Sequence, residues 1–212
     1  EHVLRQKGGA LAAHPEEWKE GDWAIEGLAG MEIYNLHADV KDEDLKSVLK
    51  ILPAMQKNPE TAILQIFDTP KANLARWDTI GRTRRFVGVA ANDAHQNVQF
   101  LGFQLDPYAR VFRFVNTHLL ARGRSRKALC EALREGRAYV AFEVFGRAKG
   151  FRFGAVKGER RLEMGSEETF TKGWVVEASF PKDCSWKILK DGATAAKGEG
   201  KAARFEAGAS PF

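Results

Sequence analysis

A carboxylate and an imidazole follow an apolar segment of this chain at a spacing that suits a bound metal ion. Residues 86–91 are apolar, as expected for a buried strand, and Asp93 and His95 come just after them. Carboxylate oxygens and imidazole nitrogens are common ligands of divalent cations such as zinc, manganese and iron. The spacing makes Asp93 and His95 candidate metal ligands, although an Asx turn at Asn92 would explain the same polar loop without a metal.

His14 lies at the end of a second short apolar segment, residues 10–13, and Pro15 follows it. Because proline has a fixed φ, the chain turns there and holds the imidazole at the end of the strand. Folds that alternate strands and helices place their chemistry at the carboxyl ends of strands, so His14 is a candidate partner of Asp93. A hydrogen bond from His14 to a backbone carbonyl is the alternative.

Two further histidines, His37 and His118, follow the strands predicted at 30–35 and 112–116. We assign both to substrate binding, since an imidazole can contact a phosphate or protonate a leaving oxygen; a solvated loop histidine is the alternative. Glu32 lies within the first of these strands, where an inward carboxylate is costly unless it is paired. It could orient a ligand histidine, and we do not assign it as a ligand.

The elements that must position these side chains alternate between strand and helix over residues 1–148. This order predicts an α/β fold with a parallel sheet or barrel. Residues 42–44 are acidic and should open a helix, because acidic side chains suit a helix N-terminus. Leu45, Val48, Leu49 and Leu52 form one apolar stripe of this helix, which Pro53 should end. The remaining expected elements are strands at 10–13, 30–35, 86–91 and 112–116, a helix that begins at Thr69-Pro70, and a helix from Ser125 to Arg134.

The helix from Ser125 to Arg134 is expected to bury Leu129, Ala132 and Leu133, and Cys130 is expected to be a small core residue. The second cysteine, Cys184, is distant in sequence, so no Cys-x-x-Cys zinc motif exists. After about residue 148 the helical signals end. Residues 149–212 are predicted to form a small antiparallel β module, possibly a truncated one, with strands at 150–153, 174–180 and 185–190 and a hairpin turn at Asp191-Gly192.

Composition limits the classes of function. The chain has 212 residues, 44% of them apolar, which suffices for one sizeable domain and a small module. Its 33 basic and 28 acidic residues give a net charge of only +5, and the basic groups are scattered without interleaved aromatics, so nucleic-acid binding is disfavoured. No apolar segment is long enough to span a bilayer, and the polar start is no signal peptide; we expect no membrane partner and slightly favour the cytoplasm.

The segments 8–15, 30–35 and 88–95, in this order, resemble the later part of the PHP (polymerase and histidinol phosphatase) family of metal-dependent phosphoesterases. Residues 136–142 resemble the segment that ends the domain in many members. The resemblance covers roughly residues 1–150, so 1–148 is expected to be the carboxyl-terminal part of such a domain.

The resemblance implies a partial, distorted TIM-like (β/α) barrel that binds up to three divalent metal ions, such as manganese, zinc or iron. His14 matches the ligand of the family's His-Pro motif, and Asp93 and His95 match its final Asp-x-His ligands. The implied activity is hydrolysis of a phosphorylated small molecule by metal-activated water.

The family's opening His-x-His motif is absent from these residues. We therefore expect that the chain is the carboxyl-terminal portion of a longer protein. If it is the whole protein, its metal site is incomplete, and the alternative function is a catalytically degenerate domain that binds a ligand or a partner.

Overall fold

The chain divides into two compact units, each built from segments that are separated in sequence. Unit 1 comprises residues 1–77, 88–118 and 139–146; unit 2 comprises 78–87, 119–138 and 147–212. This division differs from the predicted boundary at residue 148, because two earlier segments belong with the carboxyl-terminal part. The computed structural model describes residues 2–6, 8–41, 45–65, 67–97, 99–100, 102–104, 106–169 and 171–207.

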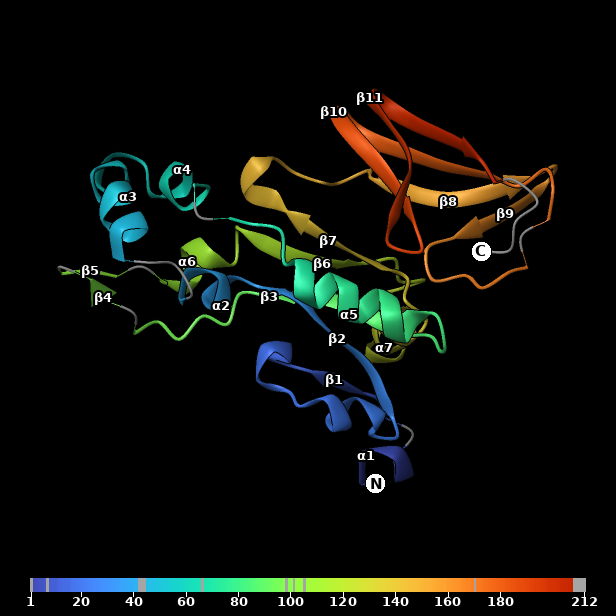
Figure 1. Cartoon of the computed structure of the whole chain (residues 1–212), viewed down its shortest axis with the longest axis horizontal. Helices are drawn as coiled ribbons and strands as arrows, with labels where there is room; N and C mark the ends of the chain where they lie inside the picture. Colours follow the sequence, from blue (N-terminus) through green and yellow to red (C-terminus); the bar gives the residue numbers. More distant parts are fainter. Residues whose placement is uncertain are drawn as a thin grey trace. The chain divides into compact units, whose positions relative to one another are not determined.

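The described residues form a mixed α/β structure of short helices and four separate sheets (Figure 1). The helical elements are α1 (His2–Arg5), η1 (Pro15–Glu17), η2 (Glu20–Ala24), α2 (Leu36–Lys41), α3 (Leu45–Lys57), α4 (Pro59–Ile63), α5 (Lys71–Gly81), α6 (Tyr108–Val111), α7 (Arg126–Arg134) and η3 (Glu143–Phe145). The strands are β1 (Ala10–Ala12), β2 (Leu28–Asn35), β3 (Val87–Ala91), β4 (Gln99–Phe100), β5 (Phe103–Gln104), β6 (Val115–Leu119), β7 (Ala138–Phe142), β8 (Arg152–Lys157), β9 (Arg160–Glu163), β10 (Val175–Lys190) and β11 (Ala193–Glu206).

A three-stranded sheet in the order β1-β2-β3 carries the segments that end in candidate ligands. β1 and β2 run parallel, with Leu11 opposite Gly30 and Ala12 opposite Met31. Met31 and Ala12 are fully buried, which explains why these short apolar segments form strands. The carboxyl ends of β1 and β2 therefore lie at one edge of this sheet, as the sequence predicts.

β6 and β7 form a separate two-stranded sheet whose strands run in opposite directions. The backbone N–H of Val144 donates to the carbonyl of Phe114, and the N–H of Leu120 donates to the carbonyl of Arg137. Residue numbers thus rise along β6 as they fall along β7. The prediction of one parallel sheet or barrel fails here, and the described strands form no closed barrel. Strand β6 also begins at Val115, three residues later than predicted, because residues 112–114 form the turn that follows α6.

The helix predicted to end at Pro53 continues through it to Lys57. Proline removes one backbone donor, but Pro53 lies at the exposed surface, where water can satisfy the carbonyl left free one turn earlier. Leu49 is 49% exposed, so the expected apolar stripe is not wholly internal. Residues 42–44, expected to open this helix, lie outside the described residues.

Helix α7 begins and ends where the sequence predicts. The Ser125 hydroxyl accepts a hydrogen bond from the backbone N–H of Ala128 at 3.2 Å and caps the helix. Only one of the expected core positions holds: Ala132 is buried, whereas Leu129 is 41% exposed and Cys130 is exposed. The prediction of Cys130 as a core residue is wrong, because the helix turns this side of its surface to solvent.

The apolar core of unit 1 is rich in aromatic rings. Tyr34 and Phe142 pack edge to face with centroids 4.7 Å apart, and Phe67 contacts both rings. The buried members of this core are Tyr34, Leu36, Ile51, Ala62, Val111, Phe114 and Val115. Since Tyr34 lies next to the last residue of β2 and Val115 begins β6, the core fixes the strands from which the polar loops emerge.

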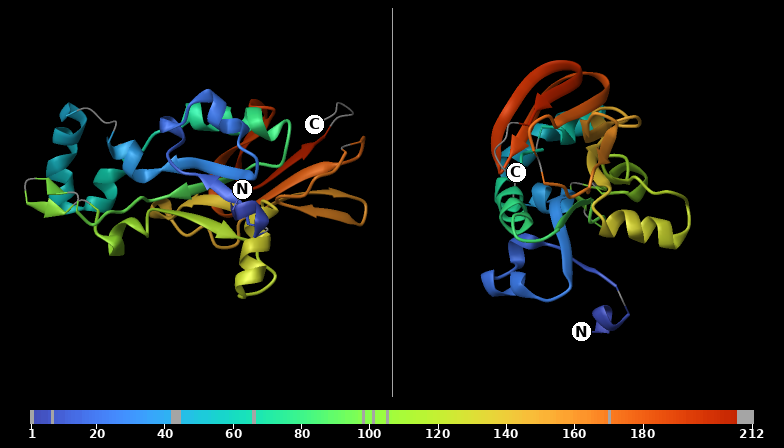
Figure 2. Two further views of the ribbon diagram at one scale, coloured as in Figure 1. Left: turned by 90° about the horizontal axis from the view of Figure 1, so that it is seen from below. Right: turned by 90° about the vertical axis from the view of Figure 1, so that its right-hand side faces the viewer.

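Unit 2 contains a four-stranded antiparallel sheet in the order β11-β10-β8-β9, which confirms the predicted β module. Figures 1 and 2 show these orange and red strands as a curved sheet with one long hairpin. The segments predicted at 174–180 and 185–190 are parts of one strand, β10, whose pairing with β11 is interrupted between Ser179 and Cys184. Trp174, Val176 and Ala178 are buried in the core of this sheet.

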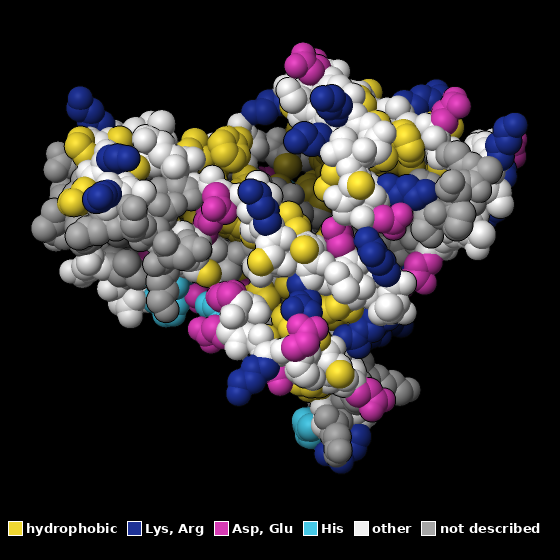
Figure 3. Space-filling model, in the orientation of Figure 1, with side chains coloured by type: hydrophobic (Ala, Val, Ile, Leu, Met, Phe, Trp, Pro, Cys, Tyr) yellow, Lys and Arg dark blue, Asp and Glu magenta, His cyan; other side chains and the backbone are white. Residues whose placement is uncertain are grey.

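Basic side chains do not gather into one patch on the face of the molecule drawn in Figure 3. On the face drawn in Figure 3, dark blue lysine and arginine side chains are dispersed and lie among magenta acidic ones. This distribution gives no groove of one charge for a nucleic-acid backbone on that face. Among the described residues, none of the helices combines the length and the apolar character needed to span a bilayer.

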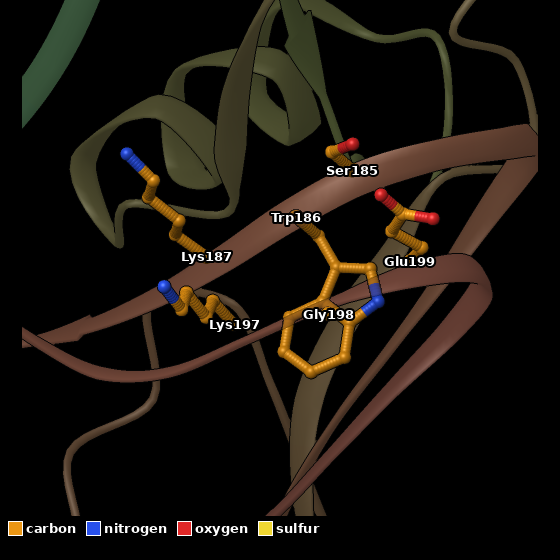
Figure 4. A pocket seen from close by; sticks show the side chains of 6 residues that line it. All are labelled: Ser185, Trp186, Lys187, Lys197, Gly198 and Glu199. Atoms are coloured by element: carbon orange, nitrogen blue, oxygen red, sulfur yellow. The ribbon is translucent and has the colours of Figure 1, made fainter.

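The long hairpin depends on an indole ring that crosses the neighbouring strand at a glycine. Trp186 of β10 stands opposite Gly198 of β11, and Figure 4 shows its ring lying over that position. A Cβ atom at residue 198 would lie 2.5 Å from Cζ2 of Trp186. Lys187 and Lys197 face each other across the same strands beside it, as Figure 4 also shows. The pairing therefore requires glycine at residue 198.

We expect Gly198→Ala to lower the stability of the protein by about 1–3 kcal/mol, because a rigid indole would have to move out of the core of the sheet. Thermal unfolding of the two proteins measures the difference.

Gly81→Ala is the matched control, since a Cβ there would meet no atom within 4 Å. Residue 81 ends α5, and alanine in a helix is favoured over glycine by roughly 0.5–1 kcal/mol, so this variant should melt at the same temperature or higher. Equal melting of Gly198→Ala and the unaltered protein would contradict the packing described for Trp186.

Candidate metal centre

The loops after β1 and β3 bring His14 and Asp93 together in unit 1. Both residues adopt left-handed backbone conformations, with φ of 48° and 49°. This conformation is uncommon for residues other than glycine and is found most often at turns and functional sites. The turn at His14 is continued by Pro15, which begins η1. The sequence prediction that Pro15 holds the imidazole at the strand end fits this geometry.

The carboxylate of Asp93 faces the ring of His14 without a hydrogen bond. Oδ2 of Asp93 lies 3.2 Å from Nε2 of His14. The same oxygen is buried and accepts no hydrogen bond from any described residue. A buried, unpaired carboxylate oxygen is costly, so this position calls for a cation. Two ligands of one cation at bond lengths of about 2.1 Å lie roughly 3–3.4 Å apart, which matches this contact.

His95 and His37 lie around the same carboxylate. Nε2 of His95 is 3.8 Å from Oδ1 of Asp93, and the rings of His37 and His95 lie 4.8 Å apart. One potential ligand atom from each of His37, Asp93 and His95 lies within 4.8 Å of the others. The separations exceed those of ligands on one ion, but His95 is 48% exposed and has room to move. His37 and His95 thus lie near a carboxylate that His14 also contacts, and imidazoles with a carboxylate are a donor set suited to zinc, manganese or iron.

Glu16 orients the ring of His14. Nδ1 of His14 lies 3.0 Å from Oε1 of Glu16, and since a carboxylate only accepts hydrogen bonds, Nδ1 carries the proton. In the neutral ring this leaves the lone pair on Nε2, the nitrogen that faces Asp93. A carboxylate on the far nitrogen of a ligand histidine is a common arrangement at metal sites.

The pKa of His14 is raised from its ordinary value. The hydrogen bond to Glu16 is the main cause, burial acts in the opposite direction, and the charges of Asp93, Glu16 and Glu32 raise the pKa further. His14 therefore holds a proton more readily than an ordinary histidine does, and it lies between the carboxylates of Asp93 and Glu16. A proton and a metal ion compete for the same nitrogen.

Two other carboxylates hold the backbone of the histidine-bearing loops. Oε2 of Glu32 accepts the backbone N–H of His14 at 3.0 Å, and Oδ2 of Asp106 accepts the backbone N–H of His95 at 3.0 Å. The sequence predicts that Glu32 could orient a histidine. It predicts no such role for Asp106 or Glu16. The position of Glu16 two residues after His14 is a local indication of their contact, whereas nothing near Asp106 in the sequence indicates its contact with His95.

His118 lies apart from this cluster in its described contacts. Nε2 of His118 is 2.9 Å from Oε1 of Glu143, and its ring stacks on Tyr139 at 4.8 Å. Burial is the main cause that raises the pKa of Tyr139, and the charge of Glu143 adds to it. The predicted role of His118 in substrate binding stays a prediction.

The direction of β6 explains the place of His118. The hydroxyl of Thr117 donates to the carbonyl of Ala90 and accepts its N–H, while the Asn92 side chain donates to the carbonyl of Val115. β6 thus runs opposite to β3, and the end that carries His118 lies toward the start of β3. Asp93 follows the other end. The side-chain bond of Asn92 also leads to β6 rather than into the Asx turn considered as an alternative.

No family model matches the chain, and comparisons with curated proteins and with solved structures find no match either.

We expect Asp93→Asn to separate a metal centre from a simple ion pair. Asparagine tolerates the left-handed backbone and removes a charge whose buried oxygen has no hydrogen-bond donor, so the metal-free variant should be as stable as the unaltered protein or more stable, by about 1 kcal/mol or less. Manganese or zinc at about 100 times its dissociation constant should stabilise the unaltered protein by about 2.7 kcal/mol. The variant should lose this increase, which thermal unfolding with and without metal measures.

His118→Ala is the control for nonspecific binding of metal to imidazole, because His118 contacts Glu143 instead of the cluster. It should keep the metal-dependent increase. Destabilisation of metal-free Asp93→Asn, with no metal response in the unaltered protein, would show that Asp93 and His14 form only an ion pair.

Proposed function

We propose that the chain carries a metal-dependent hydrolase site that cleaves phosphate esters. The observation that supports the proposal most strongly is the contact between His14 and Asp93. A buried carboxylate oxygen without a hydrogen-bond donor faces an imidazole nitrogen at 3.2 Å, while Glu16 holds the opposite ring nitrogen. The resemblance to PHP phosphoesterases rests on the same residues. The partial TIM-like barrel that it implies belongs to this proposal, and the parallel pair β1 and β2 supports it.

In this proposal His14, Asp93 and His95 hold the cation, and His37 either adds a fourth ligand or contacts the substrate as predicted. When bound, a divalent cation lowers the pKa of water and neutralises charge on phosphoryl oxygens. Water adds to phosphorus, the ester P–O bond breaks, and the leaving alcohol takes up a proton. The imidazole of His37 is the residue of the cluster suited to supply that proton, because histidine exchanges protons near neutral pH.

The substrate is proposed to be a phosphorylated small molecule. The arginines of segment 82–85, which could assist an anionic substrate, have other partners in unit 2. Arg82 donates to the carbonyl of Asp191, Arg85 pairs with Glu167, and Arg84 lies over the ring of Phe86. They are therefore given no role in the site.

A catalytically degenerate module that binds metal and a ligand without hydrolysis is the second candidate. The sequence itself favours it, since the His-x-His motif that opens the family's metal site is absent from these residues. Fewer metal ions would then be held than the phosphoesterases use, and the charge that develops on phosphorus would be less well stabilised.

Hydrolysis of an aryl phosphate ester tests the proposal. With manganese present, Asp93→Ala and His95→Ala should lower the rate by about 100-fold or more, since even changes around metal ligands cost roughly 10–100-fold. Glu26→Ala, which removes an exposed carboxylate of the same unit, should keep the rate.

Elemental analysis of the same samples separates the two candidates. Bound metal with hydrolysis that depends on Asp93 supports the phosphoesterase. Bound metal without hydrolysis supports the degenerate module. A chain that binds no manganese, zinc or iron contradicts both.

A further inference from the structure

One carboxylate links the loop that carries His14 to the start of helix α2, which carries His37. Oε2 of Glu32 accepts two hydrogen bonds, one from the backbone N–H of His14 at 3.0 Å and one from the side-chain amide of Asn35 at 3.1 Å. Glu32 lies within β2, and Asn35 ends the same strand. Both bonds use the same oxygen, so this part of the carboxylate is committed to protein donors.

The hydrogen bond from the backbone N–H of His14 to Glu32 stabilises an unfavourable backbone conformation. His14 has φ 48° and ψ 60° and directly precedes Pro15. The residue before a proline favours extended backbone, and a left-handed conformation is unfavourable in a residue with a Cβ. A charge-assisted hydrogen bond from Glu32 offsets part of this cost. The direction in which the His14 ring leaves the backbone depends on it.

The second bond reaches the start of α2. The side-chain oxygen of Asn35 accepts the backbone N–H of Ala38 at 3.1 Å, so it anchors the first turn that contains His37. Asn35 is only 5% exposed, and its amide donates to Glu32 while its oxygen accepts from Ala38. The amide cannot turn over without losing both bonds. A change at Glu32 is therefore transmitted to His37.

We propose that Glu32 is a positioning residue that sets the placement of two imidazoles, His14 and His37, around Asp93. The inference rests on the proposed metal centre, and it assigns Glu32 no contact with the ion. The geometric requirement is the reach of the side chain, which must span from β2 to the His14 backbone and to Asn35. The contact of Asp106 with the backbone N–H of His95 shows that a second loop of the cluster is held in the same way.

Two substitutions at residue 32 distinguish the effect of side-chain length from the effect of negative charge. Glu32→Gln keeps the length and an oxygen that accepts both bonds, whereas Glu32→Asp keeps the charge and shortens the side chain by one methylene. If positioning is the role, Glu32→Asp should weaken manganese binding by about 10–100-fold, and Glu32→Gln should stay within about threefold. Isothermal titration of the full chain with manganese measures both affinities.

The reverse order of the two variants would overturn the proposal, because it would show that the negative charge acts on the ion directly. Unchanged affinity in both variants would also overturn it. Glu26→Ala is the matched control and should bind manganese like the unaltered chain.

A second measurement needs no metal. In the metal-free chain, Glu32→Asp should shift the imidazole resonances of His14 and His37 in NMR spectra and leave those of His118 unchanged. If these shifts occur but the unaltered chain binds no manganese, the positioning role stands and the metal centre fails. If His14 and His37 do not shift, Glu32 does not position them.

Discussion

An unsatisfied carboxylate oxygen on Asp93 is the constraint around which unit 1 arranges its polar residues. The oxygen is buried at the end of β3 and meets no hydrogen-bond donor among the described residues. His14 contacts this oxygen, and His95 and His37 lie near the same carboxylate group. The cost of burying such a charge explains why the nearest group is an imidazole nitrogen and why a second carboxylate, Glu16, holds the far side of that ring. A cation at this point would satisfy all of these groups at once.

The backbone contributes as much to this arrangement as the side chains do. His14 and Asp93 both depart from the usual right-handed or extended conformations. Carboxylates from other parts of unit 1 accept the N–H groups of His14 and His95. Strained conformations persist only where the surroundings determine them fully. The hydrogen bonds to Glu32 and Asp106 contribute to such determination for the loops that carry His14 and His95.

The local elements and the members of the cluster could be predicted from the sequence, because each depends on short-range signals. Apolar segments before His14 and Asp93 form strands as expected, and Ser125 caps its helix. His14, Asp93 and His95 meet because parallel pairing and strand-end loops follow general rules. The contact between Glu32 and His14 spans 18 positions in sequence, so the sequence indicated that the carboxylate needs a partner without identifying the partner.

Strand direction and helix orientation were not predictable in the same way. The residues of β6 have the same apolar pattern whether the strand runs with β3 or against it, and the choice decides where His118 lies. The exposure of Cys130 and Leu129 likewise depends on which side of α7 meets the rest of unit 2, which an apolar pattern alone does not define. Pro53 continues its helix because its surroundings are solvent, a condition that sequence reasoning did not include.

The interleaved course of the chain has a consequence for its evolution and for its engineering. Unit 2 takes residues 78–87 and 119–138 from between the segments that form unit 1. The carboxyl-terminal sheet is therefore no appendage that a single gene fusion adds or a single cut removes. To exchange this sheet for another, all three segments of unit 2 would have to be replaced together. Residues 147–212 would therefore be inherited together with residues 78–87 and 119–138.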